Sequence, residues 1–162
     1  MLAVYRYPHA VSRSRIELRD AAAADLPALL ALEAGFPGDR LSPRQYRHHL
    51  GNPRARLRVL SLDGRAVGSS LCLFRRGSEV ARLYSIVVDA AVRGRGLGAQ
   101  LLADAEAGAR ARGATRLRLE VRTDNPAAIA LYRHSGYRPI GRLPGYYEDR
   151  AEALRLERTL TD

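Results

Sequence analysis

The middle of the sequence contains Val88-Asp89-Ala90-Ala91-Val92-Arg93-Gly94-Arg95-Gly96-Leu97-Gly98, a segment rich in glycine and arginine. The apolar run at its N-terminal side, Ile86-Val87-Val88, is typical of a buried strand. On its C-terminal side, apolar residues recur with the period of an amphipathic helix over residues 96–112, and Gly113 ends that pattern. The segment is therefore predicted to be the loop between a buried strand and an amphipathic helix.

The composition of this loop suits a bound pyrophosphate. Three of the five residues from Gly94 to Gly98 are glycines, which let main-chain amides approach a ligand closely. The start of the following helix adds about half a positive charge and free N–H groups. Arg93 and Arg95 add full positive charges. The loop is therefore a candidate site for a polyphosphate ligand.

A second ligand class fits part of the same loop. Gly94-Arg95-Gly96-Leu97-Gly98-Ala99 also matches the relaxed dinucleotide pattern G-x-G-x-x-G/A, and Glu120 follows where an acid for a ribose would lie. Too little chain follows the loop, however, for a doubly wound sheet. The strands before it are joined by a tight Asp63-Gly64 hairpin, so they are expected to be antiparallel. A nicotinamide cofactor is therefore the weaker alternative.

The rest of the chain alternates between strand and helix patterns. The predicted elements are a strand at 15–19, helices from Asp25 to Gly35 and from Ser42 to Leu50, strands at 57–62, 66–74 and 80–89, the helix at 96–112, a strand at 117–121, a helix from Asn125 to Gly136, and strands at 137–142 and 153–160. Asp25, Ser42 and Asn125 are expected to cap their helices. This order predicts an α/β fold with a mixed sheet. Residues 1–14 are expected to be a flexible leader and 15–162 a single domain.

Length and composition exclude several classes of protein. The 162 residues include 27 basic and 17 acidic ones, a formal net charge of +10, and every one of the 27 is an arginine. Without lysine the chain lacks the P-loop lysine of NTP-binding proteins and the Schiff-base lysine of pyridoxal enzymes. The single cysteine, Cys72, makes no internal disulfide, and no apolar run reaches the length of a membrane span. We therefore expect a cytoplasmic protein without metal or membrane partner, whose charge favours anionic ligands.

Two motifs resemble a known family. Arg93-Gly94-Arg95-Gly96-Leu97-Gly98 matches the R/Q-x-x-G-x-G/A signature of the GNAT superfamily, the acyl-CoA-dependent N-acetyltransferases. The run from Glu120 to Tyr132, with Ser135-Gly136-Tyr137, resembles the bacterial ribosomal-protein-alanine N-acetyltransferases in particular. The resemblance implies a mixed, mostly antiparallel sheet of about six or seven strands, flanked by about four helices, with a splayed central strand pair.

The resemblance also implies acetyl-CoA as the co-substrate, lying in a V-shaped gap where the strand at 82–88 parts from the strand at 116–121. A main-chain N–H near Ile86 would donate to the oxyanion. The implied cofactor contacts are Ile86, Val87 and Val88 through their main chain, Arg93, Gly94, Arg95, Gly96, Leu97, Gly98 and Ala99 around the pyrophosphate, and Asn125 on the pantetheine side. Core packing is the alternative for the three strand residues, and both roles are compatible because the main chain binds while the side chains pack.

The implied chemistry is direct attack of an amine on the thioester. At pH 7, deprotonation costs about 1.4 kcal/mol for an α-amine and about 4.6 kcal/mol for a lysine side chain. Glu120 is the candidate base, because alternation with Leu117, Leu119 and Val121 places it on the other face of its strand. An ordinary solvent-facing glutamate is the alternative. Tyr132 is the candidate acid, and an amphipathic aromatic side chain at a helix end is the alternative.

These residues predict an N-acetyltransferase that moves an acetyl group from acetyl-CoA to a primary amine, with a protein N-terminus, such as that of a ribosomal protein, as the acceptor. A small-molecule or antibiotic amine is an alternative acceptor. An RNA- or ribosome-binding module without catalysis is an alternative of another class, although the reaction itself requires no nucleic acid. Residues Tyr146–Asp149 are candidates to line the acceptor site, although Arg150–Arg155 departs from the subfamily pattern. A monomer and a homodimer are both compatible with the sequence.

Overall fold

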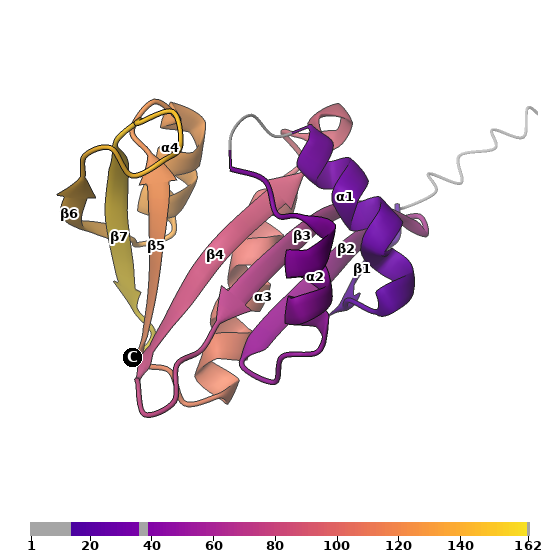
Figure 1. Ribbon diagram of the computed structural model, residues 1–162, viewed down its shortest axis with the longest axis horizontal. Coiled ribbons are helices and arrows are strands. Elements are labelled where there is room, and N and C mark those ends of the chain that lie inside the picture. Colours follow the sequence, from indigo (N-terminus) through magenta and orange to yellow (C-terminus); the bar gives the residue numbers. More distant parts are fainter. Residues whose placement is uncertain (1–13, 36–38, 162) are drawn as a thin grey trace, which may run out of the picture.

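The computed structural model describes residues 14–35 and 39–161 (Figure 1). The strands are β1 (Ile16–Asp20), β2 (Ala55–Leu62), β3 (Arg65–Leu73), β4 (Val80–Val88), β5 (Arg116–Arg122), β6 (Arg138–Leu143) and β7 (Ala153–Thr159). The α-helices are α1 (Leu26–Ala34), α2 (Pro43–Leu50), α3 (Leu97–Ala111) and α4 (Pro126–His134), and short 3-10 helices η1 (Ala23–Asp25) and η2 (Ala90–Val92) precede α1 and α3. The predicted elements are present in the predicted order. The expected leader, apart from Ser14, lies outside the described residues.

The seven strands form one sheet in the order β1-β2-β3-β4-β5-β7-β6. All neighbouring strands are antiparallel except β4 and β5, which are parallel. This confirms the predicted mixed, mostly antiparallel sheet. It also removes the nicotinamide alternative, because the strand before the glycine loop has an antiparallel neighbour, β3, where a doubly wound sheet would have a parallel one.

Local sequence signals explain several turns and helix starts. Asp63 and Gly64 both have positive φ angles, 51° and 82°, as the tight turn between β2 and β3 requires. Ser42 caps α2, because its hydroxyl accepts from the Gln45 N–H at 3.2 Å and the Gln45 side chain accepts from the Ser42 N–H at 2.8 Å. The prediction for Asp25 was wrong in one respect. It precedes α1, but its carboxylate accepts from the Ala22 N–H and from Arg19 and makes no bond to the helix.

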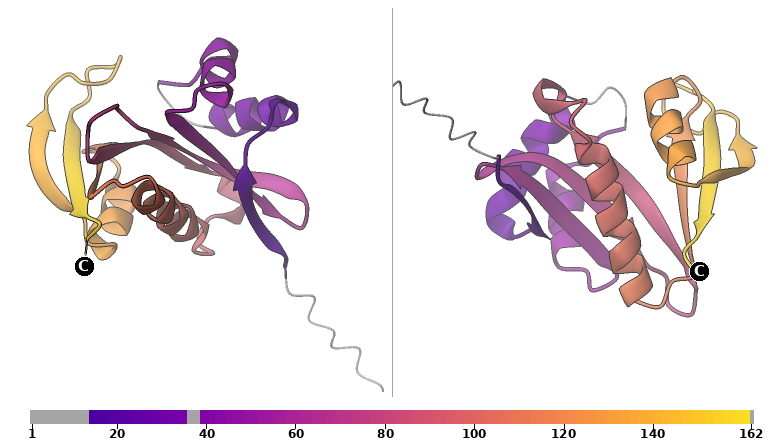
Figure 2. Two further views of the ribbon diagram at one scale, coloured as in Figure 1. Left: turned by 90° about the horizontal axis from the view of Figure 1, so that it is seen from below. Right: turned by 180° about the vertical axis from the view of Figure 1, so that it is seen from behind.

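Helices cover both faces of the sheet. Figure 2 shows α3 on one face and α1 and α2 on the other. Three apolar clusters result: α1 and α2 pack on β2 and β3, α3 packs on the opposite face, and α3 and α4 share a core with β5 and β7. In the described ranges, no helix has both the length and the apolar character needed to cross a membrane.

The parallel pair β4 and β5 separates along its length. Residues Val80–Leu83 pair with Arg116–Leu119, and the pairing ends there, although both strands continue. Beyond that point β4 stays paired with β3 up to Val88, and β5 stays paired with β7 (Figure 1). The predicted splayed central pair is therefore confirmed. Within residues 14–35 and 39–161, one main-chain edge of residues 84–88 has no strand partner. Main-chain N–H and C=O groups require partners when they are removed from water.

Candidate functional site

The turn between η2 and α3 presents main-chain N–H groups in open space. Gly94 and Gly96 have φ angles of +81° and +75°, a conformation that side chains rarely adopt, and an added Cβ at either would meet nothing within 4 Å. Gly96 is the N-cap of α3 and has no side chain to bond the first helical N–H groups. Gly98 serves packing instead, because an added Cβ would lie 3.4 Å from Leu131 of α4. The turn is therefore a candidate anion cradle.

Two contacts fix the turn to the end of β4. The Asp89 carboxylate accepts from the Ala91 N–H at 2.9 Å and holds η2, while the Asp89 N–H bonds the Val67 carbonyl at 2.8 Å. Val92 is buried below the turn. Arg93 and Arg95 are exposed, and Arg93 Nε lies 3.4 Å from the Val88 carbonyl oxygen. Both guanidinium groups are thus available to an anion at the start of α3.

The residues of β4 that precede the turn combine packing with a free main-chain edge. Ile86 and Val88 pack into the cores beside α3, and Val87 is buried. Along one edge of β4, the main chains of these three residues are paired with β3. The edge toward β5 is the one left without a strand partner, so the strand leads continuously into the glycine turn.

The side chain of Glu120 has little solvent exposure and is bound by two arginines. Its side chain is only 6% exposed, and it directly follows Leu119, the last residue of β5 that pairs with β4. Arg82 Nε donates to its Oε2 at 3.1 Å, and Arg155 Nε and Nη2 donate to its Oε1 at 3.2 and 3.0 Å. The ordinary solvent-facing glutamate that the sequence left open does not match this arrangement. The predicted alternation is confirmed, because Leu117, Leu119 and Val121 are buried on the opposite face.

Tyr132 lies at the C-terminal end of α4 with its side chain largely buried. Its ring packs edge-on against Tyr137, with ring centroids 5.8 Å apart. Loss of solvent around the phenol, with a smaller contribution from Tyr147, raises the pKa of Tyr132 to about 12. Among the described residues its phenol has no hydrogen-bond partner. Tyr132 therefore keeps its proton at neutral pH and can donate a hydrogen bond to a bound group.

Asn125, the other predicted residue of this region, caps α4. Its side-chain oxygen accepts from the Ala128 N–H at 3.2 Å, and its own N–H bonds the Arg122 carbonyl at 3.1 Å. Its predicted contact with the pantetheine side stays a prediction. Its side-chain amide nitrogen is not used by the cap.

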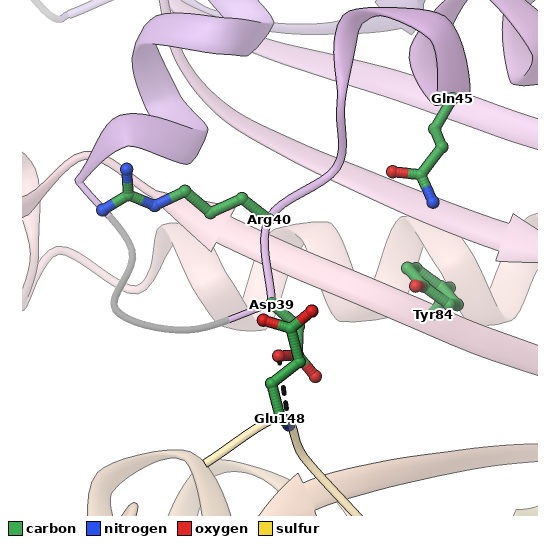
Figure 3. Close-up of a pocket in the computed structure, with 5 residues that line it drawn as sticks. All are labelled: Asp39, Arg40, Gln45, Tyr84 and Glu148. Atoms are coloured by element: carbon green, nitrogen blue, oxygen red, sulfur yellow. Dashed lines mark hydrogen bonds between the residues drawn. The ribbon is translucent and has the colours of Figure 1, made fainter.

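A hollow of about 600 Å³ opens beside β4 on the face of the sheet that carries α2 (Figure 3). It is lined by Asp39, Arg40, Gln45, Tyr84 and Glu148. The Glu148 N–H lies 3.4 Å from Asp39 Oδ1, so the segment before α2 meets the loop between β6 and β7 here. In Figure 3 the Arg40 guanidinium points away from the two carboxylates. Glu148 belongs to the segment Tyr146–Asp149 that the sequence singled out for the acceptor side.

Sequence reasoning missed Arg82 and Arg155. Both are arginines on strands in a chain with 27 basic residues, so neither stands out by type. Their significance comes from the register that places β4, β5 and β7 side by side, with Glu120 opposite Arg155. No local pattern encodes that pairing.

Comparison with known proteins agrees with this geometry. The sequence model of the Acetyltransferase (GNAT) family matches residues 21–137. A Bacillus subtilis protein provisionally named ribosomal protein bS18-alanine N-acetyltransferase is 29% identical over 141 residues, which cover 86% of this chain and 92% of that protein. An uncharacterized Mycobacterium leprae protein, ML0378, is 49% identical over 65 residues, 40% of this chain, but the match spans only 17% of that protein. The crystal structure of the Escherichia coli ribosomal-protein-S18-alanine N-acetyltransferase superposes with a TM-score of 0.82 at 26% identity, covering 91% of this chain and 96% of that one.

Proposed function

Because this chain belongs to the GNAT acetyltransferase family, we propose that it transfers the acetyl group of acetyl-CoA to the α-amine of a protein N-terminus. One observation carries this proposal: β4 and β5 part after Leu83 and Leu119, and the free edge of β4 leads directly into the open glycine turn. A ligand with a diphosphate at one end and a peptide-like arm at the other fits this arrangement, with the diphosphate at the turn and the arm along the free edge of β4. Two relatives named for ribosomal-protein alanine acetylation support the acceptor class.

The residues present fit acetyl-CoA. The open space beside Gly94 and Gly96 and the first N–H groups of α3 suit the diphosphate oxygens, with Arg93 and Arg95 beside them. The unpaired edge of residues 84–88 suits the amide groups of the pantetheine arm. When bound, acetyl-CoA supplies the activated acetyl group. In this proposal a main-chain N–H near Ile86 donates to the oxygen on which negative charge develops, a contribution that fixed donors make efficiently.

Glu120 is the proposed proton acceptor for the attacking amine. It lies just beyond the last β4–β5 pair, so its carboxylate is at the point where the two strands part. An N-terminal α-amine suits this site, because losing its proton at pH 7 costs only about 1.4 kcal/mol, against about 4.6 kcal/mol for a lysine side chain. With an α-amine as acceptor, Glu120 therefore has to contribute little to deprotonation, even though two arginines already bind its carboxylate.

Tyr132 is the proposed hydrogen-bond donor to the leaving sulfur. Its pKa of about 12 keeps the phenol protonated throughout the physiological range. Complete transfer of that proton to a thiolate of pKa about 8.5 is uphill by about 5 kcal/mol. The phenol therefore stabilises the charge that develops on sulfur, and the thiol receives its final proton from solvent.

The hollow beside β4 and α2 is the proposed entry for the acceptor. It is lined by side chains from the segment before α2, from β4 and from the loop between β6 and β7, and it holds the carboxylates of Asp39 and Glu148. Such groups suit a peptide that arrives with a positively charged N-terminus. A ribosomal-protein acceptor would also favour the cytoplasm as the location of the enzyme.

Release of free thiol from acetyl-CoA, measured over a panel of acceptors, tests the proposal. The panel contains N-terminal peptides beginning with alanine, the same peptides with a blocked N-terminus and an internal lysine, and small polyamines. We expect thiol release with the free N-termini and none with the blocked peptides. Turnover confined to small amines would mean that the acceptor is a small amine and not a protein N-terminus. Binding of RNA without any thiol release would refute the proposal that the protein is an enzyme.

A further inference from the structure

Arg82 connects two parts of the proposed site. It lies on β4 opposite Arg118, one pair before the β4–β5 pairing ends. Its Nε donates to Glu120 Oε2 at 3.1 Å, and its Nη2 donates to the Tyr146 phenol oxygen at 2.6 Å. Tyr146 belongs to the loop between β6 and β7, which also carries Glu148 at the hollow. One guanidinium therefore joins the candidate base to the loop on the acceptor side.

The hydrogen bonds on Glu120 distinguish its two oxygens. An ionised carboxylate offers about four lone-pair positions, two on each oxygen. Arg155 Nε and Nη2 occupy both positions on Oε1. Arg82 occupies only one position on Oε2, and no other described residue donates to it. Oε2, the oxygen on the Arg82 side, is thus the atom with room to accept a proton from an amine or from a bridging water.

We propose that Arg82 is a positioning residue for the acetyl transfer, which orients Glu120 Oε2 and holds Tyr146 so that the β6–β7 loop keeps its place at the acceptor side. The inference rests on the proposed function for its catalytic part. The hold on the loop is a property of the folded chain alone.

The chemistry of arginine suits this task. A planar guanidinium presents several N–H groups in a fixed fork and can bond two partners in different directions, whereas a lysine ammonium is a point charge on a flexible stem. Contact with the Tyr84 ring, whose centroid lies 5.4 Å from the Arg82 guanidinium carbon, further restricts the side chain. Tyr84 lines the same hollow. Arg82 therefore contacts a residue that lines the hollow as well as Glu120 and Tyr146.

A matched control lies directly opposite Arg82 on the neighbouring strand. Arg118 on β5 donates through Nε and Nη2 to Glu157 of β7 at 2.9 and 2.7 Å. Its side chain is 34% exposed, against 40% for Arg82, and among the described residues its side-chain hydrogen bonds go to Glu157 rather than to Glu120 or Tyr146. Arg118→Gln therefore removes a similar strand-to-strand ion pair without touching the proposed connection.

The first measurement is hydrogen exchange of the loop amides over residues 144–152, followed by mass spectrometry, and it needs no catalysis. We expect at least a severalfold faster exchange in Arg82→Gln and in Tyr146→Phe, and unchanged exchange in Arg118→Gln. Arg155→Gln, which loses a bond to Glu120 but none to Tyr146, is expected to leave the loop unchanged. Unchanged loop exchange in a folded Arg82→Gln variant would overturn the proposal.

The second measurement separates positioning from general stability. For a peptide acceptor, Arg82→Gln is expected to raise KM about tenfold, the effect of losing one hydrogen bond to a charged group, with an unchanged Kd for acetyl-CoA. Arg82→Lys, which keeps the charge, is expected to be intermediate, and combining Arg82→Gln with Tyr146→Phe is expected to raise KM no further. Additive effects would contradict the connection. If the wild-type protein acetylates no amine at all, the proposed function fails, and the exchange measurement still decides whether Arg82 holds the loop.

Discussion

Replacing Gly96 by alanine tests the anion cradle, and Gly113 provides its control. The two glycines flank α3: Gly96 caps its N-terminus with a φ angle of +75°, and Gly113 follows its C-terminus with a φ angle of +83°. An added Cβ would meet nothing within 4 Å at either position. Both substitutions therefore carry the same backbone strain of about 1–2 kcal/mol, which lowers the free energy of unfolding by that amount.

Only the methyl group introduced by Gly96→Ala would lie where the diphosphate approaches the main chain. Loss of one hydrogen bond from an N–H to a charged phosphate oxygen weakens binding by about 1.5–3 kcal/mol, or about 10- to 150-fold in Kd. We expect this weakening in Gly96→Ala and a wild-type Kd in Gly113→Ala. Calorimetric titration with CoA gives the Kd values, and urea unfolding gives the stabilities.

Two results would refute this reasoning. An unchanged Kd in Gly96→Ala would mean that the diphosphate does not lie on this turn. Equal weakening in both variants would mean that strain in α3, rather than the cradle, controls binding.

Two further predictions concern Tyr132 and Asp104. Tyr132→Phe should lower kcat about 10²-fold, the effect of losing one fixed donor to a developing charge, and leave both the Kd for acetyl-CoA and the urea midpoint unchanged, because the phenol bonds no described residue; wild-type kcat in this variant would remove Tyr132 from the mechanism. Burial of Asp104 raises its pKa, but hydrogen bonds from Arg58 and Arg56 lower it by more, so the folded-state pKa lies below the usual 3.8. The stabilisation from Asp104 is therefore complete above pH 3.8 and lost as pH falls through the lower folded value. Asp104→Asn should cost about 1.5–3 kcal/mol at pH 7, with a difference from wild type that shrinks below pH 3.8 in urea titrations; a constant difference would contradict this sign.

Local patterns were sufficient for most elements of the fold. Alternation at Leu117, Leu119 and Val121 gave both β5 and the face that carries Glu120, because period-two burial is a property of the strand itself. The Ser42 and Asn125 caps followed from residue type, since short polar side chains bond the free N–H groups of a helix start. Asp25 differed because an arginine on β1 bonds its carboxylate, a contact between elements that residue type does not reveal.

The site was predictable only where it is made of consecutive residues. The glycine turn could be recognised because the spacing of its glycines along the sequence determines the conformation of the turn. The cluster of Arg82, Glu120 and Arg155 could not, because it requires three strands from distant parts of the chain to be aligned in register. The meeting of Asp39 with Glu148 is of the same kind, since 109 positions separate them in the sequence.

A crystal structure of this protein with acetyl-CoA tests the central claim most directly. The account predicts diphosphate oxygens within about 3 Å of main-chain nitrogens in the turn at 94–99, with the pantetheine arm along residues 84–88 of β4 and the thioester near Glu120 and Tyr132. Acetyl-CoA bound elsewhere, or β4 and β5 paired along their whole length in the complex, would contradict it.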